Sequence, residues 1–196
     1  MNNPSPNPSP RRGEGRIRYI IVPGLGNSGP AHWQSLWQNK LPGAVRCEQH
    51  DWDTPCPVDW VAALNDCVSL SAEPCLLVAH SLGVALVAHW AAAFNSNTVQ
   101  AALLVSPSDV DSPAHTPDSV RDFAPMPLKP LPFRSIVVAS SDDPFVSLAR
   151  AEQFANAWQA ELFVIGPCGH INADSGLGDW PQGLDLLAKL SGAPRH

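Results

Sequence analysis

The sequence predicts an α/β fold built on a mostly parallel sheet of about six strands, with helices on both faces. Six short apolar runs recur along the chain, and a helical or loop segment follows each of them. Most of the runs are continuously apolar and rich in valine, isoleucine and leucine, which is typical of strands covered on both faces. The chain has 196 residues, of which 44% are hydrophobic. That is enough for one substantial core and too little to favour two.

The six apolar runs give the expected strands. The run at 44–49 is more polar than the others, so we expect it near an edge of the sheet. In chain order the runs span residues 18–22, 44–49, 75–79, 101–106, 135–139 and 161–165.

Helices are expected between these strands. In the second one, an apolar stripe forms because Trp60, Leu64, Cys67 and Val68 follow each other at helical spacing. The expected helices span residues 32–39, 58–69, 82–94, 148–158 and 181–190.

A proline-rich segment, residues 107–132, breaks the alternation of strands and helices. A loop of this length inside a compact domain is usually functional or mobile. It leaves the carboxyl end of the fourth expected strand, and ligands bind at that edge of open α/β sheets. We expect it to be either a partial lid over a site or a stiff surface connection.

Composition excludes several classes of partner. The net charge is -6, and lysine and arginine form no cluster beyond Arg11 and Arg12, so the basic face that nucleic acid requires is missing. No apolar run approaches the roughly 18 residues of a membrane span. The first ten residues have no hydrophobic stretch of the kind a secretory signal uses, and prolines alternate there. We therefore expect a disordered leader at 1–15, a single domain at 16–196 and a cytoplasmic location.

The cysteines and histidines indicate no metal site. The five cysteines are an odd number without a C-x-x-C pair, which favours small buried thiols over disulfides. The seven histidines show no metal-binding spacing. The sequence implies no metal and no cofactor.

A nucleophile elbow is the strongest motif in the chain. The apolar run ending at Ala79 and His80 leads directly into Ser81, and small helix-compatible residues follow. A serine on such a tight strand-to-helix turn points its hydroxyl over the end of the sheet. Gly83 stands two residues after the serine, as the turn requires, while Ala79 replaces the glycine of G-x-S-x-G two residues before it. Ser81 is therefore a candidate nucleophile.

An acid and a histidine follow at later strand ends, in the chain order that catalytic triads of this kind use. A serine needs a base to take its proton and a third group to orient that base. His170 follows the sixth expected strand, and Asp142 and Asp143 follow the fifth. We favour Asp143 as the orienting acid, because it directly precedes Pro144 in an Asp-Pro-x-Val run that starts the next helix. The alternative is that Asp142 orients the histidine while Asp143 caps that helix.

The loop after the first expected strand supplies a candidate oxyanion hole. Its glycines let the backbone come close to a substrate, so we expect donors from the backbone N–H groups of Leu25 and Leu82. Gly24, Gly26 and Gly29 also form a G-x-G-x-x-G, the rival signature of a nucleotide site. No acidic residue stands well placed about 20 residues further on, which disfavours that alternative.

Four residues near this loop are expected to line the pocket: Gly24, Gly26, His32 and Trp33. For His32 and Trp33, burial in an amphipathic helix explains their positions equally well. His80 is interpreted as a packing or hydrogen-bonded residue rather than a second base.

With these motifs in view, the chain resembles the small α/β-hydrolase family that includes retinoblastoma-binding protein 9 and the bacterial YdeN-like serine hydrolases. The resemblance covers nearly all of the chain from Arg18 onward. It is carried by Val22-Pro23-Gly24 with His32-Trp33, His80-Ser81-Leu82-Gly83, Ser141 to Phe145, and Gly169 to Asn172 followed by Gly176 to Pro181. It implies a compact α/β-hydrolase fold without a large cap, and a triad on Ser81, Asp143 and His170.

These observations together predict a cofactor-independent serine hydrolase. We expect a carboxylesterase that cleaves small-molecule acyl esters through an acyl-enzyme on Ser81. The alternative is a non-catalytic member of the hydrolase fold that binds a protein or a ligand. The sequence does not indicate a protein partner.

Overall fold

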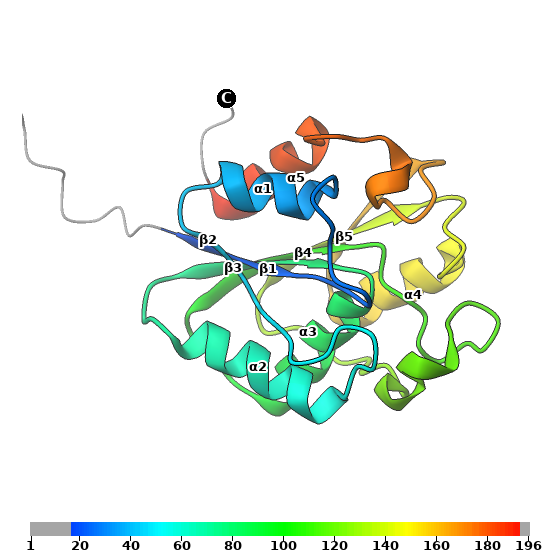
Figure 1. Ribbon diagram of the computed structural model, residues 1–196, viewed down its shortest axis with the longest axis horizontal. Helices are drawn as coiled ribbons and strands as arrows, with labels where there is room; N and C mark the ends of the chain where they lie inside the picture. The colour runs from blue at the N-terminus through cyan, green and yellow to red at the C-terminus, as the bar shows by residue number, and fades with distance from the viewer. Residues whose placement is uncertain (1–16, 193–196) are drawn as a thin grey trace, which may run out of the picture.

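The computed structural model describes residues 17–192 (Figure 1). The expected leader at 1–15 lies outside the described residues. The six apolar runs form one sheet of six strands in which all neighbouring strands pair in parallel, as predicted. The sheet order is β2-β1-β3-β4-β5-β6. The strands are β1 (Arg18–Val22), β2 (Ala44–Arg46), β3 (Cys75–His80), β4 (Val99–Val105), β5 (Arg134–Ser140) and β6 (Glu161–Gly166).

The second strand lies at an edge of the sheet, as its polar composition predicted. It ends at Arg46, three residues before the predicted end. Cys47 still donates its backbone N–H to the carbonyl of Ile21, at 2.8 Å, and the chain then leaves the ladder.

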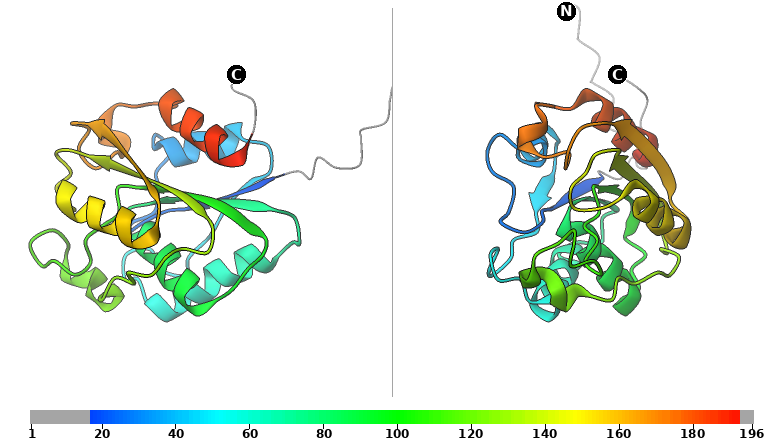
Figure 2. Two further views of the ribbon diagram at one scale, coloured as in Figure 1. Left: turned by 180° about the vertical axis from the view of Figure 1, so that it is seen from behind. Right: turned by 90° about the vertical axis from the view of Figure 1, so that its right-hand side faces the viewer.

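The helices cover both faces of the sheet (Figures 1 and 2). The helices α1 and α5 pack on one face, where Trp33, Trp37 and Trp180 form an aromatic cluster. The helices α2, α3 and α4 pack on the other face, around a larger apolar core. None of the helices among residues 17–192 is long and apolar enough to cross a membrane. Each helix agrees with its predicted limits to within one residue: α1 (Trp33–Lys40), α2 (Pro57–Ser69), α3 (Leu82–Ala93), α4 (Leu148–Trp158) and α5 (Pro181–Ser191).

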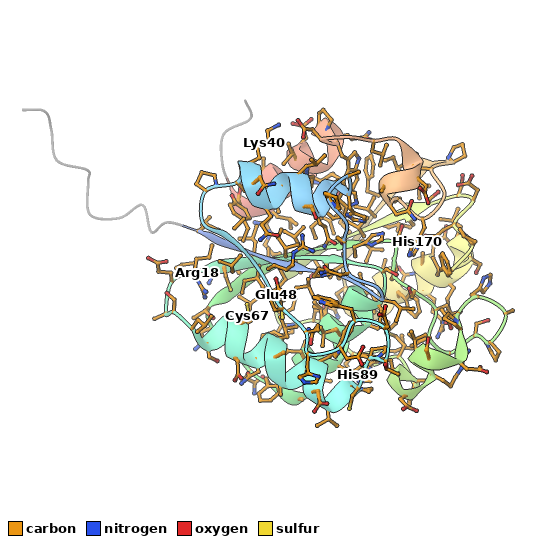
Figure 3. The ribbon with its side chains drawn as sticks, in the orientation of Figure 1. Arg18, Lys40, Glu48, Cys67, His89 and His170 are labelled. Carbon is orange, nitrogen blue, oxygen red and sulfur yellow. The ribbon has the colours of Figure 1, made fainter. Side chains whose placement is uncertain are left out.

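The strand order reverses at β1, and this positions the site. From β1 the chain goes first to β2 on one side and then to β3 on the other. The chain therefore leaves β1 and β3 toward opposite faces of the sheet, and the carboxyl edge at such a reversal is where ligands bind in open α/β sheets. Arg18 at the start of β1 and His170 beyond the end of β6 lie at opposite ends of the sheet (Figure 3).

The proline-rich segment between β4 and β5 folds onto the core. It contains a short 3-10 helix, η1 (Asp118–Phe123), and buries Phe123 completely. The guanidinium of Arg121 donates hydrogen bonds to the backbone carbonyls of Val110, at 2.7 Å, and Thr116, at 2.8 Å. These internal contacts indicate a stiff connection, and Thr116, Pro117 and Val120 of the same segment also line the pocket described below, as the lid alternative expects.

The five cysteines, all within the described residues, are free thiols. Burial was predicted correctly for Cys47, Cys67 and Cys75. It was wrong for Cys56, which is exposed because it stands at the surface where α2 begins, and only partly right for Cys168.

Candidate active site

The predicted elbow is formed by the turn between β3 and α3. Ser81 has φ 58° and ψ -126°, a conformation that L residues rarely adopt, and α3 begins at the next residue. Its backbone N–H donates to the carbonyl of Val105 at the end of β4, at 3.0 Å. The turn therefore holds the serine hydroxyl above the carboxyl edge of the sheet.

Two glycines allow this turn to pack against the loop after β1. A Cβ at Gly83 would lie 2.3 Å from the carbonyl oxygen of Val22, and one at Gly24 would lie 2.8 Å from the Cβ of Ser81. Neither distance is compatible with a side chain, so only glycine lets the two backbones approach this closely. The close approach brings the loop that carries Leu25 next to the elbow.

The three predicted side chains meet at this edge. Nε2 of His170 lies 2.8 Å from Oγ of Ser81, and Nδ1 lies 2.9 Å from both carboxylate oxygens of Asp143. The Asp143 side chain is fully buried, and the His170 side chain is 9% exposed. A carboxylate only accepts hydrogen bonds, so Nδ1 carries a proton, and in the neutral imidazole Nε2 is free to accept from Ser81. Burial from water strengthens both contacts.

Asp142 faces the other way and holds the loop that carries His170. Its Oδ1 accepts from the Ser140 hydroxyl at 2.7 Å and from the backbone N–H of Gly169 at 2.8 Å. These hydrogen bonds, led by that of Ser140, lower the pKa of Asp142 below its ordinary value. Of the two aspartates that the sequence left open, Asp143 is the one in contact with His170.

The residues of the two expected oxyanion donors line the same pocket as Ser81. Leu25 and Leu82 both line the pocket, and neither backbone N–H donates to another residue in the described part of the chain. Leu82 is the first residue of α3, where unpaired N–H groups and the helix dipole favour negative charge. Two free donors beside a serine hydroxyl are suited to bind a developing oxyanion.

A buried glutamine, which sequence reasoning missed, supports this loop. Nε2 of Gln34 donates to the carbonyls of Val22, at 3.2 Å, and Val78, at 2.9 Å, and so bridges β1 and β3. Its Oε1 accepts from the Ser28 hydroxyl at 2.6 Å. Arg46 contacts the same loop, donating to Asn27 and to the Ser28 carbonyl. The sequence shows Gln34 only as one polar residue in an amphipathic helix.

Two neutral histidines pack beside His170. Nε2 of His80 donates to the carbonyl of His170, at 2.8 Å, which agrees with the prediction that it is a hydrogen-bonded residue. Burial lowers the pKa of His80 well below its ordinary value. His32 caps α1 by accepting the Gln34 N–H on Nδ1, and burial followed by the charge of Arg46 lowers its pKa from 6.5 to about 4. Both imidazoles are uncharged at neutral pH, so they add no positive charge beside His170.

A pocket of about 360 Å³ opens over Ser81. Gly24 and His32 line it, as predicted. Gly26 and Trp33 do not. Gly26 turns away and donates its N–H to the carbonyl of Trp52, and Trp33 is buried in the aromatic cluster, where its Nε1 donates to the carbonyl of Ile171 at 2.7 Å. The remaining wall is mostly apolar and includes Leu25, Pro117, Val120 and Phe145.

A second serine, which the sequence did not single out, touches the first. Oγ of Ser108 lies 2.9 Å from Oγ of Ser81, and Ser108 is 5% exposed. It follows β4, the strand next to β3, in the sequence Ser106-Pro107-Ser108. A hydroxyl just past a neighbouring parallel strand is the signal that would have found it.

A parallel sheet with a serine on a strand-to-helix elbow, and with an acid and a histidine at later strand ends, defines an α/β hydrolase. The chain belongs to the serine hydrolase family, whose model matches residues 19–189. This agrees with the family resemblance drawn from the motifs.

Solved structures show the same fold, and the first of those below also supports the family. A YdeN-like hydrolase from Pectobacterium atrosepticum is 31% identical, with a TM-score of 0.79 over 90% of this chain and 91% of that one. The YdeN gene product of Bacillus subtilis is 22% identical, with a TM-score of 0.74 over 90% and 99%. Esterase 2 of Thermogutta terrifontis is 16% identical, with a TM-score of 0.66 over 95% and 89%. No curated protein sequence matches the chain.

Proposed function

We propose that this serine hydrolase is a carboxylesterase that cleaves small-molecule acyl esters through an acyl-enzyme on Ser81. One observation carries the proposal: an unbroken line of hydrogen bonds runs from Asp143 through His170 to the Ser81 hydroxyl, at 2.9 Å and 2.8 Å. This line ends at the floor of a pocket that also presents the free N–H groups of Leu25 and Leu82. Nucleophile, base, orienting acid and oxyanion donors are all the groups that acyl transfer requires.

In the acylation step, Oγ of Ser81 attacks the ester carbonyl carbon while its proton passes to Nε2 of His170. The carbonyl electron pair moves onto oxygen, where the Leu25 and Leu82 N–H groups stabilise the negative charge. Asp143 stabilises the imidazolium and keeps it oriented. The tetrahedral intermediate then collapses, its bond to the alcohol oxygen breaks, and the alcohol leaves with the proton from His170.

Deacylation repeats these steps with water. His170 takes a proton from the water as its oxygen attacks the acyl carbon, and the second intermediate again places its charge beside Leu25 and Leu82. When the bond to Oγ of Ser81 breaks, His170 returns the proton to that oxygen and the carboxylic acid is released. The enzyme is regenerated without a cofactor.

The size and lining of the pocket support small acyl groups. Its volume of about 360 Å³ is at the lower end of ligand pockets, which span about 300–1,000 Å³. Leu25, Val120 and Phe145 offer apolar surface to an acyl chain, and the rigid segment between β4 and β5 closes one side. The name of the Thermogutta relative, an esterase, favours ester bonds over amides.

The proposal is tested by turnover of p-nitrophenyl esters of graded acyl length. We expect hydrolysis that is fastest for short chains, and loss of that activity in Ser81→Ala. Ser141→Ala is the matched control, because Ser141 is an exposed serine at the same edge of the sheet and should keep wild-type activity. A folded wild-type protein that turns over none of the esters would contradict the proposal and favour a non-catalytic binding protein.

A further inference from the structure

We infer that Ser108 is a further catalytic residue, whose hydroxyl donates a hydrogen bond to the nucleophilic oxygen of Ser81. The inference rests on the proposed function and adds a fourth side chain to it. Its basis is the distance of 2.9 Å between the two hydroxyl oxygens. In this contact Ser108 can only be the donor and Ser81 the acceptor.

The direction of this hydrogen bond follows from the hydrogen bonds that Asp143, His170 and Ser81 make with one another. The Asp143 carboxylate can only accept, so Nδ1 of neutral His170 holds the ring proton and Nε2 accepts. The single proton of the Ser81 hydroxyl is therefore used on Nε2, at 2.8 Å. The contact with Ser108 must then be made with a proton of Ser108, because Ser81 has no second one to give.

The backbone fixes Ser108 in this position. Its neighbour Asp109 donates its backbone N–H to the carbonyl of Phe145, at 3.0 Å, in the loop that also carries Asp143. The carboxylate of Asp109 accepts from Nε of Arg150, at 3.2 Å, with both side chains largely buried. On the other side, Val105 accepts the Ser81 N–H at 3.0 Å. Both serines are thus held against the same end of β4.

Donation to Ser81 has two consequences for acylation. A hydroxyl oxygen has two lone pairs, so when Ser108 occupies one, the remaining lone pair is the one that attacks. As the Ser81 proton moves to His170, the oxygen gains negative charge, and a hydrogen bond to a charged acceptor is about twice as strong as a neutral one. The contact therefore stabilises the transition state more than the resting state, as catalysis requires.

The test uses the rate at which a fluorophosphonate labels Ser81, since this reaction measures attack by the serine alone. Oγ of Ser81 bonds to phosphorus, fluoride leaves, and the serine proton passes to His170. We expect the second-order rate constant to fall about tenfold in Ser108→Ala, the size expected for one hydrogen bond that strengthens with charge. The kcat/KM for a p-nitrophenyl ester should fall by a similar factor.

Two controls separate this role from packing. Ser106→Ala removes a fully buried hydroxyl on the same strand end that has no hydrogen-bond partner among the described residues, and it should label at the wild-type rate. Ser108→Thr and Ser108→Val are nearly equal in shape, and only threonine keeps the hydroxyl. We expect Ser108→Thr to stay within about threefold of wild type and Ser108→Val to be as slow as Ser108→Ala.

Two results would overturn the inference and leave the proposed function intact: Ser108→Ala that labels as fast as an active wild type, or equal rates for Ser108→Thr and Ser108→Val. A wild-type protein that neither labels nor hydrolyses esters would instead remove the proposed function, and the inference with it.

Discussion

Replacing Asp143 by asparagine tests how the acid sets the state of His170. Both carboxylate oxygens lie 2.9 Å from Nδ1, so the amide NH₂ of Asp143→Asn would face that nitrogen whichever oxygen it replaced. Because Oδ1 stays the acceptor of the Phe145 N–H, the NH₂ takes the Oδ2 position and donates to Nδ1, and the neutral ring then carries its proton on Nε2, pointing at Ser81. His170 would no longer be a base toward the serine.

The expected loss is large because the tautomer is reversed while the geometry is retained. The oxygen that accepts the backbone N–H of Phe145, at 2.9 Å, remains available in asparagine, so the loop should keep its shape. We expect kcat to fall about 10⁴-fold, or about 5 kcal/mol, the loss seen when a triad acid becomes an amide.

The assay is p-nitrophenyl ester hydrolysis, with Asp142→Asn as the matched control. Asp142 is exposed, and asparagine keeps an oxygen that can accept from Ser140 and Gly169, so we expect at most about a fivefold loss. Asp143 does not set the tautomer of His170 if Asp143→Asn retains activity within tenfold of wild type, or if the two variants lose activity equally.

Two further predictions concern stability, and urea denaturation measures both. Gly83→Ala should lower the free energy of unfolding by about 3 kcal/mol or more, because the new Cβ would lie 2.3 Å from the Val22 carbonyl oxygen. Gly29→Ala is the control: a Cβ there would meet nothing within 4 Å, so the free energy of unfolding should change by less than about 1 kcal/mol. Equal losses in the two variants would contradict the close packing at Gly83. His32 is neutral in the fold, with a pKa of about 4 against 6.5 when unfolded, so its contribution is complete above pH 6.5 and is lost as the pH falls toward 4. Between pH 7 and 5, protonation of His32 should lower the free energy of unfolding by about 2 kcal/mol. His32→Asn keeps an acceptor for the Gln34 N–H and should make the free energy of unfolding less dependent on pH in this range. An unchanged pH dependence would contradict the lowered pKa of His32.

The strands could be located from the sequence because buried parallel strands are continuously apolar. Where an exposed residue interrupts a strand, the apolar pattern misses part of that strand. The strand β4 begins at Val99, two residues before the predicted start, because the exposed Gln100 breaks the apolar run. The edge strand β2 was instead predicted three residues too long, because its composition does not mark where the chain leaves the sheet after Arg46. Composition reports burial, and it locates a strand only as far as the strand is buried.

The site was predicted only as far as each residue stands in a motif. Ser81 and His170 follow strands directly, so topology brings them to one edge. Asp142 and Asp143 are adjacent and point in different directions, which only the path of the loop decides. Ser108 lies in a proline-rich segment whose course no local pattern specifies.

The site of covalent labelling by a fluorophosphonate, read by intact mass and peptide mapping, tests most directly whether Ser81 is the nucleophile. We expect one adduct per chain, on Ser81, and none in folded Ser81→Ala or, at matched times, in His170→Ala. Labelling at another residue, or no adduct on folded wild-type protein, would contradict it.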